Sequence, residues 1–247
     1  MHARAEKPMD RVVLEALEPR LLLDGNVTVT VSEGVDVKIK GDRLGNDISI
    51  GAGIGAGQYH VTGNDGTTVN GLLFVVVENV SDDFKIDMRG GDDRVEMSHL
   101  TVPDKLQVKT KWGSDVVRLH NVTVLGVAKF SGGYRDDELT VLSSDFHRHV
   151  KFEGGRGADW FHADGSHFYS TVRAGGSRGH GDHVEFRNST FDGWLAVYLG
   201  AGGDFFTLDT CPTNAGGRAN GGWGWDTVTI GGFYPFGFFW SGFEATL

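Results

Sequence analysis

Residues 115–137, DVVRLHNVTVLGVAKFSGGYRDD, decide the fold, because they form one complete unit of an internal repeat. The unit begins at one aspartate, carries alternating apolar residues and ends in a glycine-containing turn before the next aspartate. A period this regular is typical of a solenoid, in which each repeat stacks on its neighbour. The equivalent aspartates are Asp93, Asp115, Asp137, Asp159, Asp182, Asp204 and Asp226, at spacings of 22, 22, 22, 23, 22 and 22 residues.

Each unit predicts at least two short strands. The residues two and four positions after the aspartate are apolar, as in Val117 and Leu119, and so are those 13 and 15 positions after it, as in Ala128 and Phe130. This alternation is typical of a strand with one buried face, whereas a helix needs a period near 3.6 residues. The sequence therefore predicts an all-β chain that folds as a single-stranded parallel β-helix, or β-solenoid, with rungs of about 22 residues.

The repeat divides the chain into four regions. Residues 81–232 are expected to form the regular β-helix. Residues 26–80 are out of register with it and are expected to form an irregular N-terminal β region and cap. Residues 1–25 are a short amphipathic leader. The aromatic residues of 233–247 are expected to cap the open end of the last rung.

Three further local features lead to expectations. The pair Asp65-Gly66 predicts a hairpin turn within the N-terminal region. Strands are expected in that region at 27–31, 35–39, 47–50, 58–61 and 72–77. A polar or small column six positions after the aspartate is expected to lie at a turn, with hydrogen bonds along the stack. Its members are His99, Asn121, Ser143, Gly165, Asn188 and Thr210.

Composition limits the partners and the chemistry. The formal net charge is −10, so no nucleic acid is expected as a partner, because nothing would drive the release of phosphate counterions. The single cysteine, Cys211, excludes a disulfide within the chain and paired-thiolate metal sites. No transmembrane segment is expected, since no apolar run reaches the roughly 20 residues that a spanning helix needs.

The leader carries a short motif. Residues 14–24, LEALEPRLLLD, resemble the LEPR-XLL motif found near the N-terminus of large surface or exported proteins of planctomycetes and some proteobacteria. The resemblance covers about a dozen residues. It implies a bacterial protein that is exported to the cell surface or the medium and has an adhesin-like, repeat-rich body.

The glycine-rich turns resemble RTX calcium repeats. Residues 154–161, GGRGADWF, and 221–228, GGWGWDTV, follow the RTX pattern in full, whereas the other turns are shorter, longer or altered. RTX turns recur every nine residues, but this chain has one such turn in about 22 residues. The resemblance therefore implies glycine-rich turn chemistry and, more weakly, calcium binding.

Stacking would place the aspartates about 5 Å apart, where adjacent carboxylates repel each other by a few kcal/mol. Calcium would relieve this repulsion, because it takes about six to eight oxygen ligands. The alternative is that each aspartate accepts hydrogen bonds from backbone N–H groups of its own turn. The candidate calcium ligands are Asp92, Asp93, Asp115, Asp136, Asp137, Asp159, Asp182, Asp204 and Asp226.

The outward positions of the strand after each aspartate form a second candidate site. Acids, arginines and aromatic rings on such a face suit a sugar chain, and the alternative is ordinary solvent-facing surface with ion pairs between rungs. The candidate ligand residues are Glu96, Arg118, Trp160, His162, His183 and Glu185. The candidates for a general base and a charge stabiliser are Arg118, His162, His183 and Glu185.

These observations favour an exported or cell-surface bacterial repeat protein with a structural, adhesive or ligand-binding role. A surface glycan is the expected partner and calcium the expected ion. The alternative is a carbohydrate-active β-helix enzyme, a lyase or hydrolase acting on acidic polysaccharide. Short segments between the strands favour the first interpretation, because such an enzyme needs a cleft walled by long loops.

Overall fold

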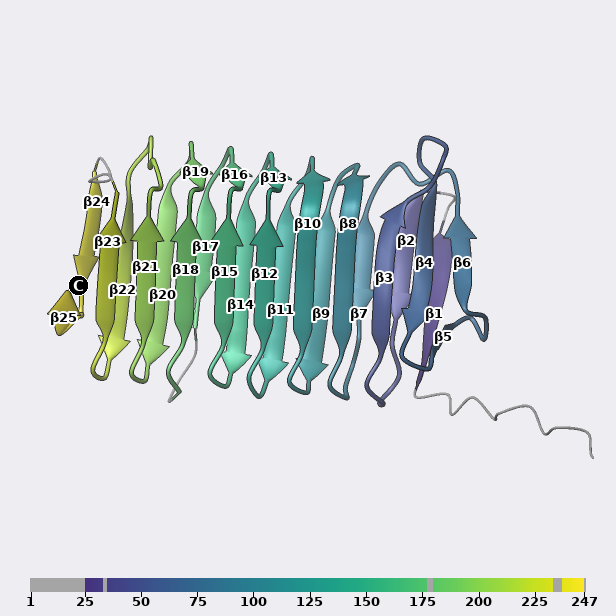
Figure 1. The fold of residues 1–247 in the computed structure, drawn as a ribbon, viewed down its shortest axis with the longest axis horizontal. Helices are drawn as coiled ribbons and strands as arrows, with labels where there is room; N and C mark the ends of the chain where they lie inside the picture. Colours follow the sequence, from purple (N-terminus) through teal and green to yellow (C-terminus); the bar gives the residue numbers. More distant parts are fainter. Residues whose placement is uncertain (1–24, 33–34, 177–179, 233–236, 247) are drawn as a thin grey trace, which may run out of the picture.

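The computed structural model describes residues 25–32, 35–176, 180–232 and 237–246 of the chain. The predicted leader, apart from Gly25, lies outside the described residues, and its resemblance to the LEPR-XLL motif stays a prediction. Every regular element in the described ranges is a β-strand. Two long sheets run side by side along the whole stack (Figure 1).

Within each sheet, neighbours in space are mostly one rung apart in sequence. The 11-stranded sheet contains, in spatial order, β24 (Phe238–Ser241), β22 (Gly217–Trp223), β20 (Leu195–Ala201), β17 (Val172–Gly175), β14 (Val150–Arg156), β11 (Ala128–Tyr134), β9 (Leu106–Trp112), β7 (Phe84–Asp87), β2 (Asp36–Lys40), β1 (Gly25–Ser32) and β5 (Thr67–Val69). The main path of the 14-stranded sheet contains β25 (Ala245–Thr246), β23 (Thr227–Gly231), β21 (Phe205–Asp209), β18 (His183–Arg187), β15 (Trp160–Asp164), β12 (Glu138–Leu142), β10 (Val116–Val124), β8 (Arg94–Val102), β3 (Asp47–Ala52), β4 (Tyr59–Asn64) and β6 (Phe74–Val77). Beside that path lie the short strands β13 (Asp145–Phe146), β16 (His167–Phe168) and β19 (Thr190–Phe191).

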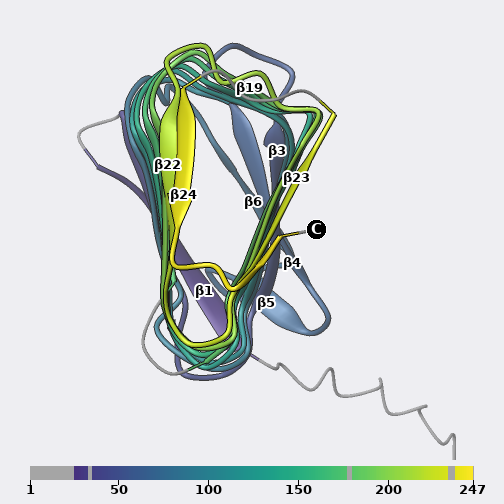
Figure 2. The ribbon, with the colours of Figure 1, turned by 90° about the vertical axis from the view of Figure 1, so that its left-hand side faces the viewer.

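Successive rungs pair in parallel, which confirms the predicted β-solenoid. Val117 pairs with Leu139 in the 14-stranded sheet, and Ala128 pairs with Val150 in the 11-stranded sheet, each one repeat of 22 residues later. Seen along the stack, the rungs superpose as one elongated loop with the two sheets as its long walls (Figure 2). The 23-residue repeat keeps this register, because its extra residue lies between β17 and β18.

The predicted inward positions form the core. Val117, Leu119, Ala128 and Phe130 are all buried, and Ile230 is one predicted position that is only partly buried. The short strands add an inward column that the repeat analysis did not predict. In it the ring of Phe168 stacks between two others, with centroids 5.2 Å from Phe146 and 4.9 Å from Phe191. Burying each such ring contributes about 1.5–3 kcal/mol.

The N-terminal region has antiparallel pairing that the regular rungs lack. Strand β1 pairs antiparallel with β2, and β4 pairs antiparallel with both β3 and β6. All five expected strands are present, and β5 is an additional one. Asp65 and Gly66 do form a turn, with φ of 43° and 86°, but the expected hairpin is wrong. The turn passes from β4 in one sheet to β5 in the other, where β5 pairs with β1.

The column six positions after the aspartate does lie at a turn, because all its members have positive φ between 46° and 60°. The hydrogen bonds that continue through successive rungs lie one residue later, at Ser144, Ser166, Ser189 and Cys211. The side chain at that next position is buried against the backbone of the neighbouring rung, so it can serve as the repeating acceptor.

The described part of 233–247 extends the stack. β24 pairs with β22 and β25 pairs with β23, so these residues form a further, shorter rung. Phe238 is buried and Phe243 packs against the core, whereas Phe239 is 69% exposed.

Candidate functional site

The seven repeat aspartates form one hydrogen-bonded ladder at the glycine-rich turn. From Asp115 onward, Oδ1 of each aspartate accepts a hydrogen bond from the backbone N–H of the aspartate one rung earlier. The N···O distance is 2.7 Å from Asp93 to Asp115 and 3.0 Å from Asp115 to Asp137. The same contact repeats at 3.0, 2.8, 2.7 and 2.8 Å as far as Asp226. All seven are buried, with at most 5% of their surface exposed.

Two residues that the repeat analysis missed end the ladder. At its start, the backbone N–H of Asn46 donates to Oδ1 of Asp93 at 2.8 Å. At its end, Oε2 of Glu244 accepts from the N–H of Asp226 at 2.7 Å. Neither residue lies 22 positions from its neighbour in the ladder, so the sequence period gave no signal for them.

The second carboxylate oxygen points into the turn. Glycine makes room for it: a β-carbon on Gly132 would lie 2.2 Å from Oδ2 of Asp137. A cavity of about 10 Å³ lies between Asp115 and Asp137, room for one water molecule at most. Among the described residues, Oδ2 is buried without a hydrogen-bond partner in Asp93, Asp115, Asp137, Asp159, Asp204 and Asp226.

Burial raises the pKa of five of these carboxyls. The pKa is about 8 for Asp93 and Asp137, about 7 for Asp159 and about 6 for Asp204, and that of Asp115 is also raised. The backbone hydrogen bonds act in the opposite direction but do not outweigh burial. Protonation can therefore relieve the repulsion along the ladder near neutral pH.

The two remaining candidate calcium ligands are less buried. Oδ1 of Asp92 accepts the N–H of Ser114 at 2.9 Å, and Oδ1 of Asp136 accepts the N–H of Ala158 at 2.9 Å. The expected alternative to calcium placed such bonds within each aspartate's own turn, but these bonds connect neighbouring rungs. Calcium binding by the ladder stays a prediction.

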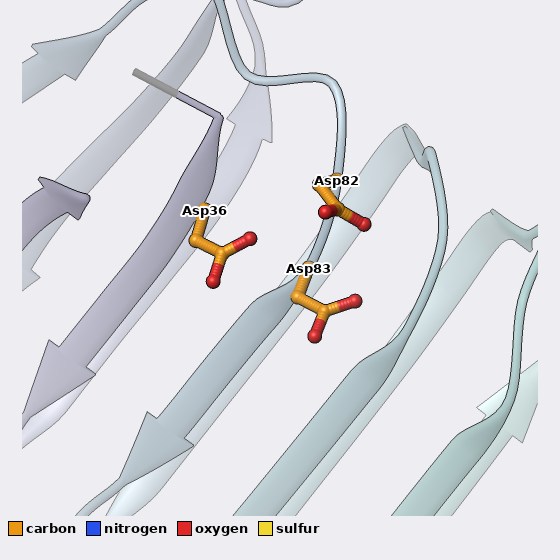
Figure 3. Close-up of side chains that lie close together, drawn as sticks. All are labelled: Asp36, Asp82 and Asp83. Carbon is orange, nitrogen blue, oxygen red and sulfur yellow. The ribbon is translucent and has the colours of Figure 1, made fainter. Parts of the chain in front are cut away.

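A separate group of acids lies at the start of β2 and β7. Within the described residues, Asp36, Asp82 and Asp83 are the group of three potential ligands whose oxygens lie within 4.8 Å of one another (Figure 3). Lys85 already neutralises part of this charge, because its Nζ lies 2.9 Å from Oδ2 of both Asp36 and Asp83. The hydrogen bond from Lys85 holds the pKa of Asp36 below its usual value.

A second ladder runs along the opposite turn. Oγ of Ser166 accepts the N–H of Ser144 at 3.1 Å, and Oγ of Ser189 accepts the N–H of Ser166 at 3.1 Å. Each hydroxyl also donates to the carbonyl two residues earlier, so both its roles are used. Cys211 takes the last place, with its Sγ 3.4 Å from the N–H of Ser189. Burial raises the pKa of its thiol to about 12, so the thiolate that would react is not formed near neutral pH.

The outer face of the 14-stranded sheet carries a row of rings. Trp160, His183 and Phe205 occupy the same register position in β15, β18 and β21. The rings of Trp160 and His183 are nearly parallel, with centroids 5.4 Å apart, and the centroids of His183 and Phe205 are 5.8 Å apart. Trp160 is 45% exposed and Phe205 50%, so ring surface faces solvent. Burial lowers the pKa of His183, which favours its neutral form.

Beside this row, Glu185 forms hydrogen bonds with two side chains, those of His162 and Arg187. Its Oε2 lies 2.9 Å from Nδ1 of His162, and its Oε1 accepts from Nε of Arg187 at 2.5 Å. Burial acts to raise the pKa of Glu185, but the hydrogen bond and charge of Arg187, with the charge of His162, outweigh burial and lower it. Glu185 is therefore a buried carboxylate that orients His162.

The structure brings together only part of the predicted ligand face. Glu96, Arg118, His162 and Glu185 share one column, with Thr140 between Arg118 and His162. Of the predicted catalytic group, only His162 and Glu185 form a hydrogen bond with each other. The guanidinium of Arg118 lies 3.3 Å from Oε1 of Glu138 instead. The Arg118–Glu138 pair joins neighbouring rungs, as expected for a solvent-facing strand, whereas Glu96 pairs with Arg94 of its own strand at 3.7 Å.

In the part of the chain that the structure describes, no helix is long and apolar enough to cross a membrane. Comparisons with protein-family models, curated proteins and solved structures found no match to this chain.

Proposed function

We propose that this chain is an exported or cell-surface bacterial β-solenoid with a structural and adhesive role, in which one sheet face binds a surface glycan. The LEPR-XLL resemblance supports the export. The two ladders support the structural role, because they connect consecutive rungs at both turns and so resist their separation.

The observation that carries the adhesive role is the aromatic row of Trp160, His183 and Phe205. Exposed ring surface on a solvent-facing strand costs free energy unless a ligand covers it. Flat rings pack against the C–H faces of sugars, and the half-exposed guanidinium of Arg187, which Glu185 orients, can donate to hydroxyl groups.

Two experiments test this proposal. Antibodies against the chain should label intact and permeabilised cells of the source bacterium equally, and labelling only after permeabilisation would overturn the export.

The second experiment measures binding of the full chain to cell-surface polysaccharide isolated from that bacterium. Trp160→Ala should weaken binding about tenfold or more, as the loss of a central aromatic contact does. The matched control is Trp225→Ala, which removes an indole that is 73% exposed at the glycine-rich turn. Equal effects of the two variants would overturn the assignment to this face.

A second candidate function is favoured by the His162–Glu185 hydrogen bond. A carboxylate on Nδ1 leaves Nε2 of neutral His162 as the acceptor, which is the arrangement of a general base. The chain would then cleave an acidic polysaccharide by elimination: His162 takes the proton next to a uronate carboxyl group, a C=C bond forms, and the bond to the glycosidic oxygen breaks as that oxygen takes up a proton from water. The test is the ultraviolet absorbance of unsaturated uronate products, which should appear with the full chain and disappear with His162→Gln.

A further inference from the structure

A row of positive charge runs along the outer face of the 11-stranded sheet. One outward register position contains, rung after rung, Lys38, Lys85, Gln107, Lys129, Lys151, Arg173, Ala196, Arg218 and Phe239. Six of these nine residues are basic, and we call those six the basic column. Every strand of the sheet from β2 to β24 contributes one member to this row (Figure 1).

Much of this charge is not neutralised. Among the described residues, Lys38 and Lys129 form no ion pair within 4.0 Å, and neither do Lys40 and Lys109 in the next outward column. Lys129, Lys40 and Lys109 are exposed. Two members of the basic column are paired, Lys85 with Asp36 and Asp83, and Lys151 with Glu153. The chain as a whole carries −10, so the unpaired lysines on this face are a local reversal of its charge.

The basic face is also hollowed. A depression of about 320 Å³ lies over β2, β7 and β9 and is lined by Lys38, Lys40, Lys85 and Lys109. Asp87 also lines it, but its carboxylate is paired with Lys111 at 2.7 Å. Because Lys85 is paired with Asp36 and Asp83, the depression presents the ammonium groups of Lys38, Lys40 and Lys109 to any molecule that lies on this face.

We propose that the outer face of the 11-stranded sheet binds an extended anionic polysaccharide, with the polymer axis along the stack and its acidic groups on the basic column. Neighbouring strands lie about 4.8 Å apart, so the column offers roughly one cation per rung. A polysaccharide with one carboxylate on each sugar presents its charges at a similar interval. The inference adds a second face and a ligand class to the proposed binding role, and its face is distinct from the aromatic row.

Nucleic acid fits this surface less well. Double-stranded DNA carries a charge about every 1.7 Å of its axis, far denser than the basic column. Single strands bind through free aromatic faces as well as cations. Two tyrosines of this sheet have guanidinium groups against their rings. The guanidinium carbons of Arg173 and Arg218 lie 5.3 and 4.7 Å from the centroid of Tyr198, and that of Arg156 lies 5.3 Å from the centroid of Tyr134. These ring faces are therefore not free to stack on a base.

The experiment measures binding of the full chain to polygalacturonate, its methyl ester and an oligothymidylate at low salt. We expect polygalacturonate to bind most tightly, with an affinity that falls as salt rises. The triple variant Lys38→Gln, Lys109→Gln, Lys129→Gln should bind at least about tenfold more weakly. The control removes three positive charges at exposed turn positions, with Arg43→Gln, Arg135→Gln and Arg148→Gln. It should retain the affinity of the native chain.

Three results would overturn the proposal: no binding of polygalacturonate at low salt, equal losses in the lysine and arginine variants, or tighter binding of the oligonucleotide. The ester arm shows whether the carboxylate is needed, and equal binding of the ester contradicts the charge argument. Circular dichroism and the unfolding midpoint check that both variants fold. Trp160→Ala should leave polygalacturonate binding unchanged, so the aromatic-face proposal and this one can fail separately.

Discussion

At both turns of the solenoid a side chain accepts a backbone N–H of the neighbouring rung, but the side chains differ in their chemistry. At the glycine-rich turn, a carboxylate oxygen accepts the backbone N–H of the rung before it, as Asp137 does for Asp115. At the opposite turn a hydroxyl does the same, as Ser166 does for Ser144. The serine also donates to Asp164, so it is fully satisfied, whereas Oδ2 of Asp137 has no partner among the described residues.

This difference predicts that one turn responds to pH and the other does not. A buried carboxyl with a free second oxygen can hold a proton there, and burial raises the pKa of Asp137 to about 8. A hydroxyl does not titrate in this range. The Asp ladder is therefore the proton-linked side of the stack.

The largest expected effect is that of pH on stability. Four ladder carboxyls, those of Asp93, Asp137, Asp159 and Asp204, titrate near 3.8 when unfolded and at about 6 to 8 when folded, so the folded chain binds more protons. Their contribution is fully present below 3.8 and is lost as pH rises through the folded values. Each carboxyl should lower the unfolding free energy by up to about 1.4 kcal/mol per pH unit in that window. Urea unfolding between pH 5 and pH 9 measures this.

The matched control for the pH effect is Asp137→Asn. The amide keeps an oxygen for the N–H of Asp115 but cannot ionise. The unfolding free energy of the variant should therefore change less with pH, by the contribution of one carboxyl. Greater stability of the native chain at pH 9 than at pH 5, or an unchanged slope in the variant, would contradict the proton-linked ladder.

The next largest expected effect is the loss of stability when one residue of either ladder is replaced by alanine. At pH 5, Asp137→Ala leaves the N–H of Asp115 buried without an acceptor and should cost about 2–3 kcal/mol, while Ser166→Ala should cost about 1–2 kcal/mol. At pH 9 the cost of Asp137→Ala should shrink, because the variant also removes a buried charge, and that of Ser166→Ala should stay the same. Denaturant midpoints at both pH values give the comparison. A parallel change in both variants would show that the turns do not differ in proton linkage.

The smallest expected effect is that of calcium on stability. Measuring it shows whether a bound ion or a bound proton relieves the repulsion between the ladder aspartates. The repeat predicts an ion. The buried position of Oδ2 behind the glycines favours the proton, and we then expect the unfolding midpoint to be the same in EDTA and in a calcium series. A calcium site filled at a hundredfold excess over its Kd would add about 2.7 kcal/mol. A rise with calcium and not with magnesium would therefore establish the ion.

The fold was predictable because individual residues recur with its period. Asp115 and Asp137 mark the rung, and the alternation at Val117 and Leu119 defines its inward face. The ladder itself was only partly predictable. The repeat places the aspartates in a column, but the N–H group that each carboxylate accepts depends on which neighbouring backbone it faces. Asp93, for example, accepts the N–H of Asn46, which lies 47 residues away in the chain.

By itself, the sequence determined the parallel stack, the rung length and the aspartate column, because a strict period with alternating apolar residues has one way to bury them. Only the tertiary structure decided the antiparallel N-terminal strands, the burial of the second carboxylate oxygen and the basic column. Lys38 and Lys85 lie 47 residues apart in the chain yet adjacent in the sheet. Basic residues that are far apart in an acidic sequence form one stripe, because stacking places residues with the same position in successive rungs next to one another.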